Sequence, residues 1–104
     1  MMDDKNEKII ISIDADIKEL MPGFLLNRQK DIKSIKEALE HNDYYNIQIL
    51  GHSMKGSGSG YGLDTISDIG ASLEKAAKER NSEDIKNLVN KLSEYLGQIK
   101  IIYE

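Results

Sequence analysis

The sequence predicts an all-α protein, an antiparallel up-down-up-down four-helix bundle with a short extended arm at its N-terminus. Two observations carry this prediction. Apolar residues recur at intervals of three and four through most of the 104-residue chain, which is the spacing of amphipathic helices. The polar breaks between these stripes are short, and short connections place consecutive helices side by side in opposite directions.

The first expected element is the arm, residues 1–15. Within it Ile9, Ile11 and Ile13 alternate with other residues, as in an extended segment. A proline is favoured in the first turn of a helix and disfavoured later, so Pro22 marks the beginning of the first long helical stripe. The arm therefore leads directly into the bundle.

Side chains that can cap helices mark the later boundaries. Asp43 is suited to begin the second helix, and Asn81 or Ser82 the fourth, because their side-chain oxygens can accept a bond from a free backbone N–H. The expected helices span residues 16–41, 43–61, 63–80 and 82–102. The residues expected inside the bundle are Ile47, Leu50, Met54, Leu73, Leu92 and Leu96. A chain of this length fits one domain, residues 1–104.

Composition excludes several classes of function. The chain has 14 basic and 18 acidic residues, a net charge of −4 and no basic block, so we expect no nucleic-acid partner. It has no cysteine, which fits a cytoplasmic protein and excludes disulfides and thiolate metal sites. Its longest apolar run, at residues 9–11, is far too short to cross a bilayer, so we expect no membrane insertion. We expect a soluble monomer.

Residues 51–62 hold five of the eight glycines and suggest, at first sight, a loop that binds a nucleotide phosphate. Such a loop follows a buried strand, and none is predicted before Gly51. In the Walker pattern the lysine follows the last glycine, whereas Lys55 precedes most of them. Apolar residues keep the helical spacing through this stretch, so we interpret it as helix.

Helical glycines need a physical reason. Each costs about 1 kcal/mol of helix stability relative to alanine, so Gly56, Gly58 and Gly60 together cost roughly 3 kcal/mol. The free energy of unfolding of a typical domain is only about 5–15 kcal/mol. Two reasons are available. We expect close approach of a neighbouring helix at Gly58, and open access for a partner at Gly56.

His52 is expected to face water. At about 100° per residue it lies about 180° from the centre of the apolar stripe of the second helix. The residues expected around it on the surface, within two turns, are Tyr45, Gln48, Ile49, Lys55, Gly56 and Ser59. A lone exposed histidine is most often an ordinary surface residue, so spacing alone leaves its role open.

The run His52-Ser53-Met54-Lys55-Gly56-Ser57, with Gly62 ten residues after the histidine and Leu73-Glu74 further on, resembles the histidine-containing phosphotransfer (HPt) domain of two-component phosphorelays. The likeness covers nearly the whole chain. Pro22-Gly23-Phe24-Leu25 with Arg28 is similar to the first helix of HPt domains attached to bacterial signalling proteins. The density of glycine after Lys55 departs from the family pattern and would loosen the end of this helix.

The resemblance implies a specific chemistry. In HPt domains an exposed histidine accepts a phosphoryl group from a receiver-domain aspartate, or from a histidine kinase, and passes it to a receiver. By position this would be His52, with Lys55 stabilising the charge of the phosphoryl group. Glu74 matches a glutamate of the related phosphoacceptor domain of the chemotaxis kinase, which accepts a bond from the histidine Nδ1. The residues that would contact a receiver are Tyr45, Gln48, Ile49, Gly56 and Ser59.

Three classes of function remain open. The first is a phosphocarrier without kinase or nucleotide-hydrolysing activity of its own, needing no cofactor or metal because the receiver brings the magnesium ion. The second is a helical receiver-binding module that does not use the histidine. The third, an enzyme with its own nucleotide site, lacks a strand-based phosphate loop. Lys55 and Glu74 can also be ordinary solvated charges. His41 is expected to be a favourable charge at a helix end rather than a second acceptor.

Overall fold

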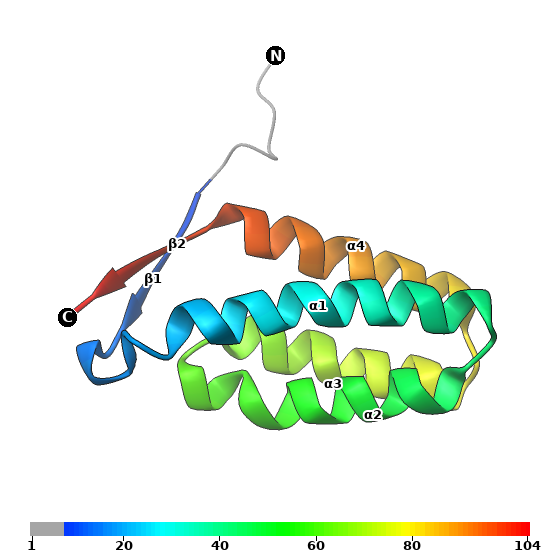
Figure 1. Cartoon of the computed structure of the whole chain (residues 1–104). Coiled ribbons are helices and arrows are strands. Elements are labelled where there is room, and N and C mark those ends of the chain that lie inside the picture. The colour runs from blue at the N-terminus through cyan, green and yellow to red at the C-terminus, as the bar shows by residue number, and fades with distance from the viewer. Residues whose placement is uncertain (1–7) are drawn as a thin grey trace, which may run out of the picture.

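The computed structural model describes residues 8–104, which form four α-helices lying side by side and a pair of short strands at one end (Figure 1). The helices are α1 (Met21–Glu40), α2 (Tyr44–Ser57), α3 (Asp64–Lys78) and α4 (Ser82–Gln98). The strands are β1 (Ile9–Ile13) and β2 (Ile99–Tyr103), and two 3-10 turns are η2 (Ala15–Ile17) and η3 (Ser59–Tyr61). The predicted mostly helical architecture is confirmed, with a strand pair in addition.

The predicted caps begin two of the helices. The Asp43 side chain accepts a bond from the backbone N–H of Asn46 at 3.2 Å, so α2 starts where expected. Asn81, rather than Ser82, caps α4 by accepting from the N–H of Asp84 at 3.1 Å. Both side chains satisfy donors that have no partner inside the helix.

The first helix begins at Met21, with Pro22 in its first turn, and not at residue 16 as its expected range had it. The preceding residues form η2 instead, where the Asp14 side chain accepts from the N–H of Asp16 at 2.8 Å. This local bond holds a 3-10 turn, which competes with an α-helical start. The proline was therefore the better boundary signal.

The fourth helix was expected to reach residue 102 and ends at Gln98. Residues 99–103 form β2, which pairs in parallel with β1 in a register that joins Ile9 to Ile99 and Ile13 to Tyr103. Ile99 and Ile102 fit a helical spacing, but β-branched residues also favour strands, and a partner strand from the other end of the chain decides between the two. The extended β1 was predicted correctly. Residues 1–7 of the expected arm lie outside the described residues.

The second helix ends at Ser57, so the prediction that it continues to residue 61 is wrong. The chain goes on through η3 to Gly62, whose φ of 79° lies in the left-handed region that glycine adopts without strain. Tyr61 stacks on Phe24 of α1, with ring centroids 4.1 Å apart. The glycine-rich stretch therefore closes as a tight turn against α1.

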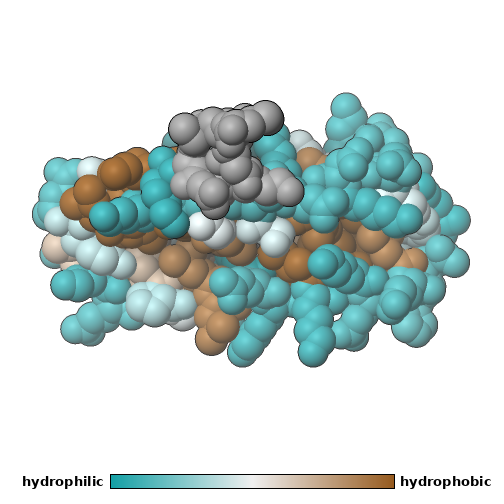
Figure 2. Space-filling view, turned by 90° about the horizontal axis from the view of Figure 1, so that it is seen from above, coloured by the Kyte–Doolittle hydropathy of each residue, from teal (hydrophilic) through white to brown (hydrophobic). Residues whose placement is uncertain are grey.

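The core draws on all four helices and on β1. Leu50 and Leu96, expected inside, are only partly buried and pack against the edge of the core. The other expected core residues are fully buried: Ile47, Met54, Leu73 and Leu92. Seen from above, most of the visible surface is hydrophilic and the hydrophobic residues gather in separate patches, one of them at the end that carries the strands (Figure 2). Within residues 8–104 no helix has the length and apolar character needed to cross a membrane.

Candidate functional site

α2 presents His52 to solvent. Ile47, Gly51 and Met54 form the buried side of this helix, and His52 projects from the opposite side with 71% of its side chain exposed. The prediction that His52 faces water is therefore confirmed. A neutral imidazole at such a position offers an accessible nitrogen nucleophile.

Two glycines bring α3 close to this part of α2. A methyl group added to Gly51 would lie 2.7 Å from the backbone nitrogen of Glu74 and 2.8 Å from the carbonyl oxygen of Gly70. One added to Gly70 would lie 2.7 Å from the carbonyl oxygen of Gly51. Since real Cβ atoms do not approach so closely, only glycine allows this spacing of the helices. It places Glu74 beside the histidine.

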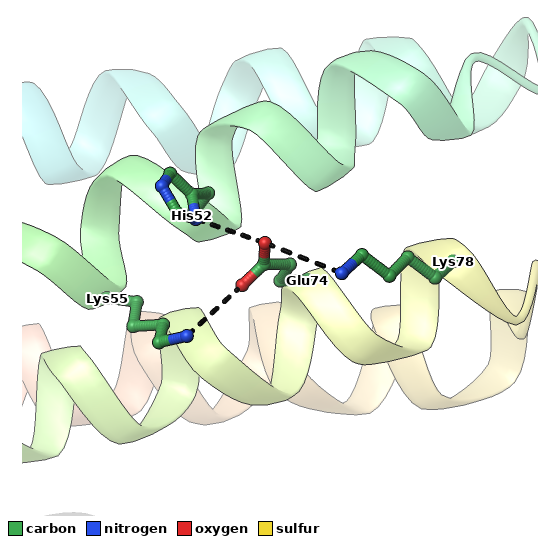
Figure 3. Close-up of polar contacts among 4 residues, drawn as sticks. All are labelled: His52, Lys55, Glu74 and Lys78. Carbon is green, nitrogen blue, oxygen red and sulfur yellow. Dashed lines mark hydrogen bonds and ion pairs between the residues drawn. The ribbon is translucent and has the colours of Figure 1, made fainter.

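Glu74 contacts the histidine ring directly. The distance between His52 Nδ1 and Glu74 Oε2 is 3.1 Å, and only 14% of the glutamate side chain is exposed (Figure 3). A carboxylate can only accept, so a neutral ring in this contact carries its proton on Nδ1 and leaves the Nε2 lone pair free. The contact thus selects the tautomer in which Nε2 can act as a nucleophile.

Two lysines complete the cluster. Lys55 Nζ lies 3.7 Å from Oε1 of Glu74, and Lys78 Nζ lies 3.8 Å from Oε2 (Figure 3). Both ammonium groups belong to side chains that are more than half exposed, 53% and 58% respectively. Sequence analysis proposed Lys55 but missed Lys78, although its position four residues after Glu74 on the same helix was a usable signal.

These neighbours set the ionisation of the glutamate. Partial burial raises the pKa of the Glu74 carboxyl, whereas the hydrogen bond and charge of the His52 ring lower it. The ammonium groups of Lys78 and Lys55 lower it further, so the pKa lies below its ordinary value of 4.5. Glu74 is therefore a carboxylate throughout the neutral pH range.

The surface beside His52 is open at most of the positions expected to meet a partner. Tyr45 and Ile49 are 70% and 46% exposed, and Gln48 is only partly exposed. A methyl group added to Gly56 would meet nothing within 4 Å. Ser59 is exposed, but Ser67 of α3 accepts its backbone N–H at 2.7 Å and its hydroxyl at 3.1 Å. Its polar groups therefore serve the contact between η3 and α3.

The close approach expected at Gly58 is present. A methyl group there would lie 2.5 Å from the backbone nitrogen of Ser67 and 2.9 Å from the carbonyl oxygen of Leu63. Gly56 and Gly58, two residues apart, therefore have different environments, one open and one closely packed. His41 follows α1, where its Nδ1 lies 3.0 Å from the carbonyl oxygen of Glu37, as suits a helix end.

Comparison with protein families identifies the family of this chain. The family model for the Hpt domain matches residues 19–101 of the 104-residue chain. The chain belongs to the Hpt domain family. Hpt domains carry out histidine phosphotransfer in phosphorelays, with receiver domains and kinases as their usual partners. Searches of the curated proteins and of the solved structures gave no significant match. Within the described part of the chain no three His, Cys, Asp or Glu side chains gather as a metal site.

Proposed function

We propose that this Hpt domain is a phosphocarrier in which His52 accepts a phosphoryl group from a receiver aspartate, or from a histidine kinase, and passes it to another receiver. The observation that carries the proposal is the contact between His52 Nδ1 and Glu74 at 3.1 Å on a ring that is 71% exposed. It supports the tautomer with a free Nε2, and Nε2 is the atom that the proposal uses.

The transfer forms one bond and breaks one. The Nε2 lone pair of His52 attacks phosphorus, and the bond between phosphorus and the aspartyl oxygen breaks, so the receiver aspartate leaves as a carboxylate with that electron pair. The Nδ1 proton stays in place, and the ring becomes a cation beside the Glu74 carboxylate. The reverse sequence returns the phosphoryl group to a second aspartate. The protonated ring is the better leaving group for this return.

Lys55 supplies charge next to the reacting atom. It follows His52 by one turn of α2, and its flexible, half-exposed side chain can turn towards the phosphoryl oxygens. Charge that develops on those oxygens during transfer is stabilised by a nearby ammonium group. The receiver brings the acidic residues and the magnesium ion. This chain supplies the nucleophile, His52, and the ammonium group of Lys55.

The receiver docks on the exposed side of α2. Ile49 and Tyr45 offer apolar surface one and two turns before His52, respectively, and Gly56 leaves space one turn after it. We also infer antiparallel neighbours throughout the bundle, because the links at residues 41–43 and 79–81 have three residues each and the link at residues 58–63 has six. This arrangement supports the docking surface, since α2 and α3 then present His52 and Glu74 together.

The proposal is tested by phosphoryl transfer from a receiver that has been loaded with labelled acetyl phosphate. We expect acid-labile label on the parent protein, none on His52→Gln, and parental labelling of His41→Gln, which serves as the matched control. Label that persists on His52→Gln would refute the assignment. A receiver that binds the parent without labelling it would favour a binding module that does not use the histidine.

A further inference from the structure

Lys78 is a fourth member of the cluster around His52. It lies on α3 four residues after Glu74, and its ammonium is 3.8 Å from Oε2 of that residue. Figure 3 shows Lys55 and Lys78 reaching the Glu74 carboxylate from opposite sides. One ammonium suffices to balance one carboxylate. The second is therefore in excess before any phosphoryl group arrives.

Phosphorylation changes this balance. The phosphoryl group carries two negative charges on its oxygens, and the ring of His52 gains one positive charge as long as Nδ1 keeps its proton. With Glu74 ionised and both lysines protonated, the formal charge of the cluster falls from about +1 to about zero. With only one lysine it would fall from about zero to about −1.

The two lysines differ in how freely they can move towards the phosphoryl group. Lys55 is on the same helix as His52, so its ammonium can leave Glu74 for the phosphoryl oxygens. Lys78 is on the same helix as Glu74, and the spacing of four residues keeps the two side chains together wherever Lys55 goes. The Glu74 carboxylate thus keeps Lys78 as a partner in both the free and the phosphorylated forms.

We propose that Lys78 is a positioning residue, which keeps Glu74 ionised and directed at His52 Nδ1 when Lys55 turns to the phosphoryl group. This inference rests on the proposed function. Without Lys78, the carboxylate would stand next to the phosphoryl charges with no ammonium partner. Glu74 would then take up a proton more readily and would hold the Nδ1 proton less firmly.

The test compares Lys78→Met with Lys75→Met and Lys78→Arg. Methionine removes the charge and keeps a long helix-forming side chain, and arginine restores the charge. Lys75 is an exposed lysine of the same helix, and among the described residues it forms no ion pair with Glu74. Each protein is phosphorylated with phosphoramidate, a small donor that needs no partner protein. Carbon-13 NMR then follows the titration of the Glu74 carboxyl in the free form. Nitrogen-15 NMR of the His52 ring follows the Nδ1 proton of the phosphorylated form from neutral to alkaline pH, where the acid-labile phosphoryl group is retained.

In the free form of Lys78→Met the Glu74 carboxyl should titrate at higher pH than in the parent. In the phosphorylated form the Nδ1 proton of His52 should be lost at lower pH than in the parent, because the less firmly ionised carboxylate holds it less firmly. Lys75→Met and Lys78→Arg should resemble the parent. At equilibrium with a phosphorylated receiver, the ratio of phosphorylated to free protein should be about two- to fivefold lower for Lys78→Met than for Lys75→Met.

Equal titration of Glu74 in the free forms of Lys78→Met and the parent, together with equal loss of the His52 Nδ1 proton in their phosphorylated forms, would overturn the inference. An effect of Lys75→Met as large as that of Lys78→Met would also overturn it, because the shift would then come from the general charge of the surface and not from Lys78 itself. A parent that no receiver labels would refute the proposed function alone, since the phosphoramidate titration still decides the role of Lys78.

Discussion

Alanine at Gly51 and alanine at Gly56 should change stability in opposite directions, although both positions lie in α2. At Gly51 the new methyl would be 2.7 Å from the Glu74 nitrogen and 2.8 Å from the Gly70 oxygen. Both atoms belong to the backbone, so α2 and α3 must separate, and overpacking of this kind costs about 1–3 kcal/mol. At Gly56 the methyl meets nothing within 4 Å, so the gain in helix propensity remains, up to about 1 kcal/mol.

Urea unfolding measures both changes, because the midpoint reports stability when the slope with denaturant is unchanged. In thermal unfolding, each 1 kcal/mol should move Tm by about 4–8 °C in a domain of this size. Gly51→Ala should also weaken the NMR signature of the Nδ1 proton of His52, since Glu74 is displaced. Equal stabilities for the two variants would refute the account of the helix contact.

The other predictions concern the reaction at His52 and the dependence of stability on pH. Transfer to His52 should fall in the order glycine, alanine, glutamine at position 56 while Tm holds or rises, and a glutamine variant as fast as the parent would mean that Gly56 does not keep access open. Lys55→Ala should slow transfer roughly tenfold, the value of one charge-assisted hydrogen bond, with helix content by circular dichroism unchanged; equal rates would make Lys55 an ordinary solvated charge. Glu74→Gln should change the nitrogen-15 shifts of the His52 ring, because an amide can also donate and no longer fixes the proton on Nδ1; unchanged shifts would remove Glu74 from the site. The lowered pKa of Glu74 implies that its contribution to the free energy of unfolding is fully present above its ordinary pKa of 4.5 and is lost as the pH falls through the lower folded value; a stability difference between parent and Glu74→Gln that did not shrink in that acid range would contradict this.

Local sequence signals were sufficient to predict most of the helices and the exposure of His52. The apolar stripes and the caps at Asp43 and Asn81 act within a few residues, so they can be seen in a sequence. The pairing of β1 with β2 could not be predicted in this way, because it joins the two ends of the described chain. A helical spacing at Ile99 and Ile102 does not contain that information.

The site was predicted less completely than the fold. His52, Lys55 and Glu74 were expected from a family pattern, and the structure places them together. The glycines that bring them together were missed. Gly51 lies between Ile47 and Met54 on the buried stripe of α2, and a glycine in such a stripe indicates close packing of backbones.

The place of the phosphoryl group tests the central claim most directly. Trypsin cuts after lysine and arginine, so residues 37–55 form one fragment that contains both His41 and His52. The parent should be phosphorylated by a loaded receiver, digested under mildly alkaline conditions and fragmented in a mass spectrometer, and a second sample should be chased with an unphosphorylated receiver. We predict that the added mass lies on His52 and disappears in the chase; mass on His41, or on no residue of this fragment, would contradict the account.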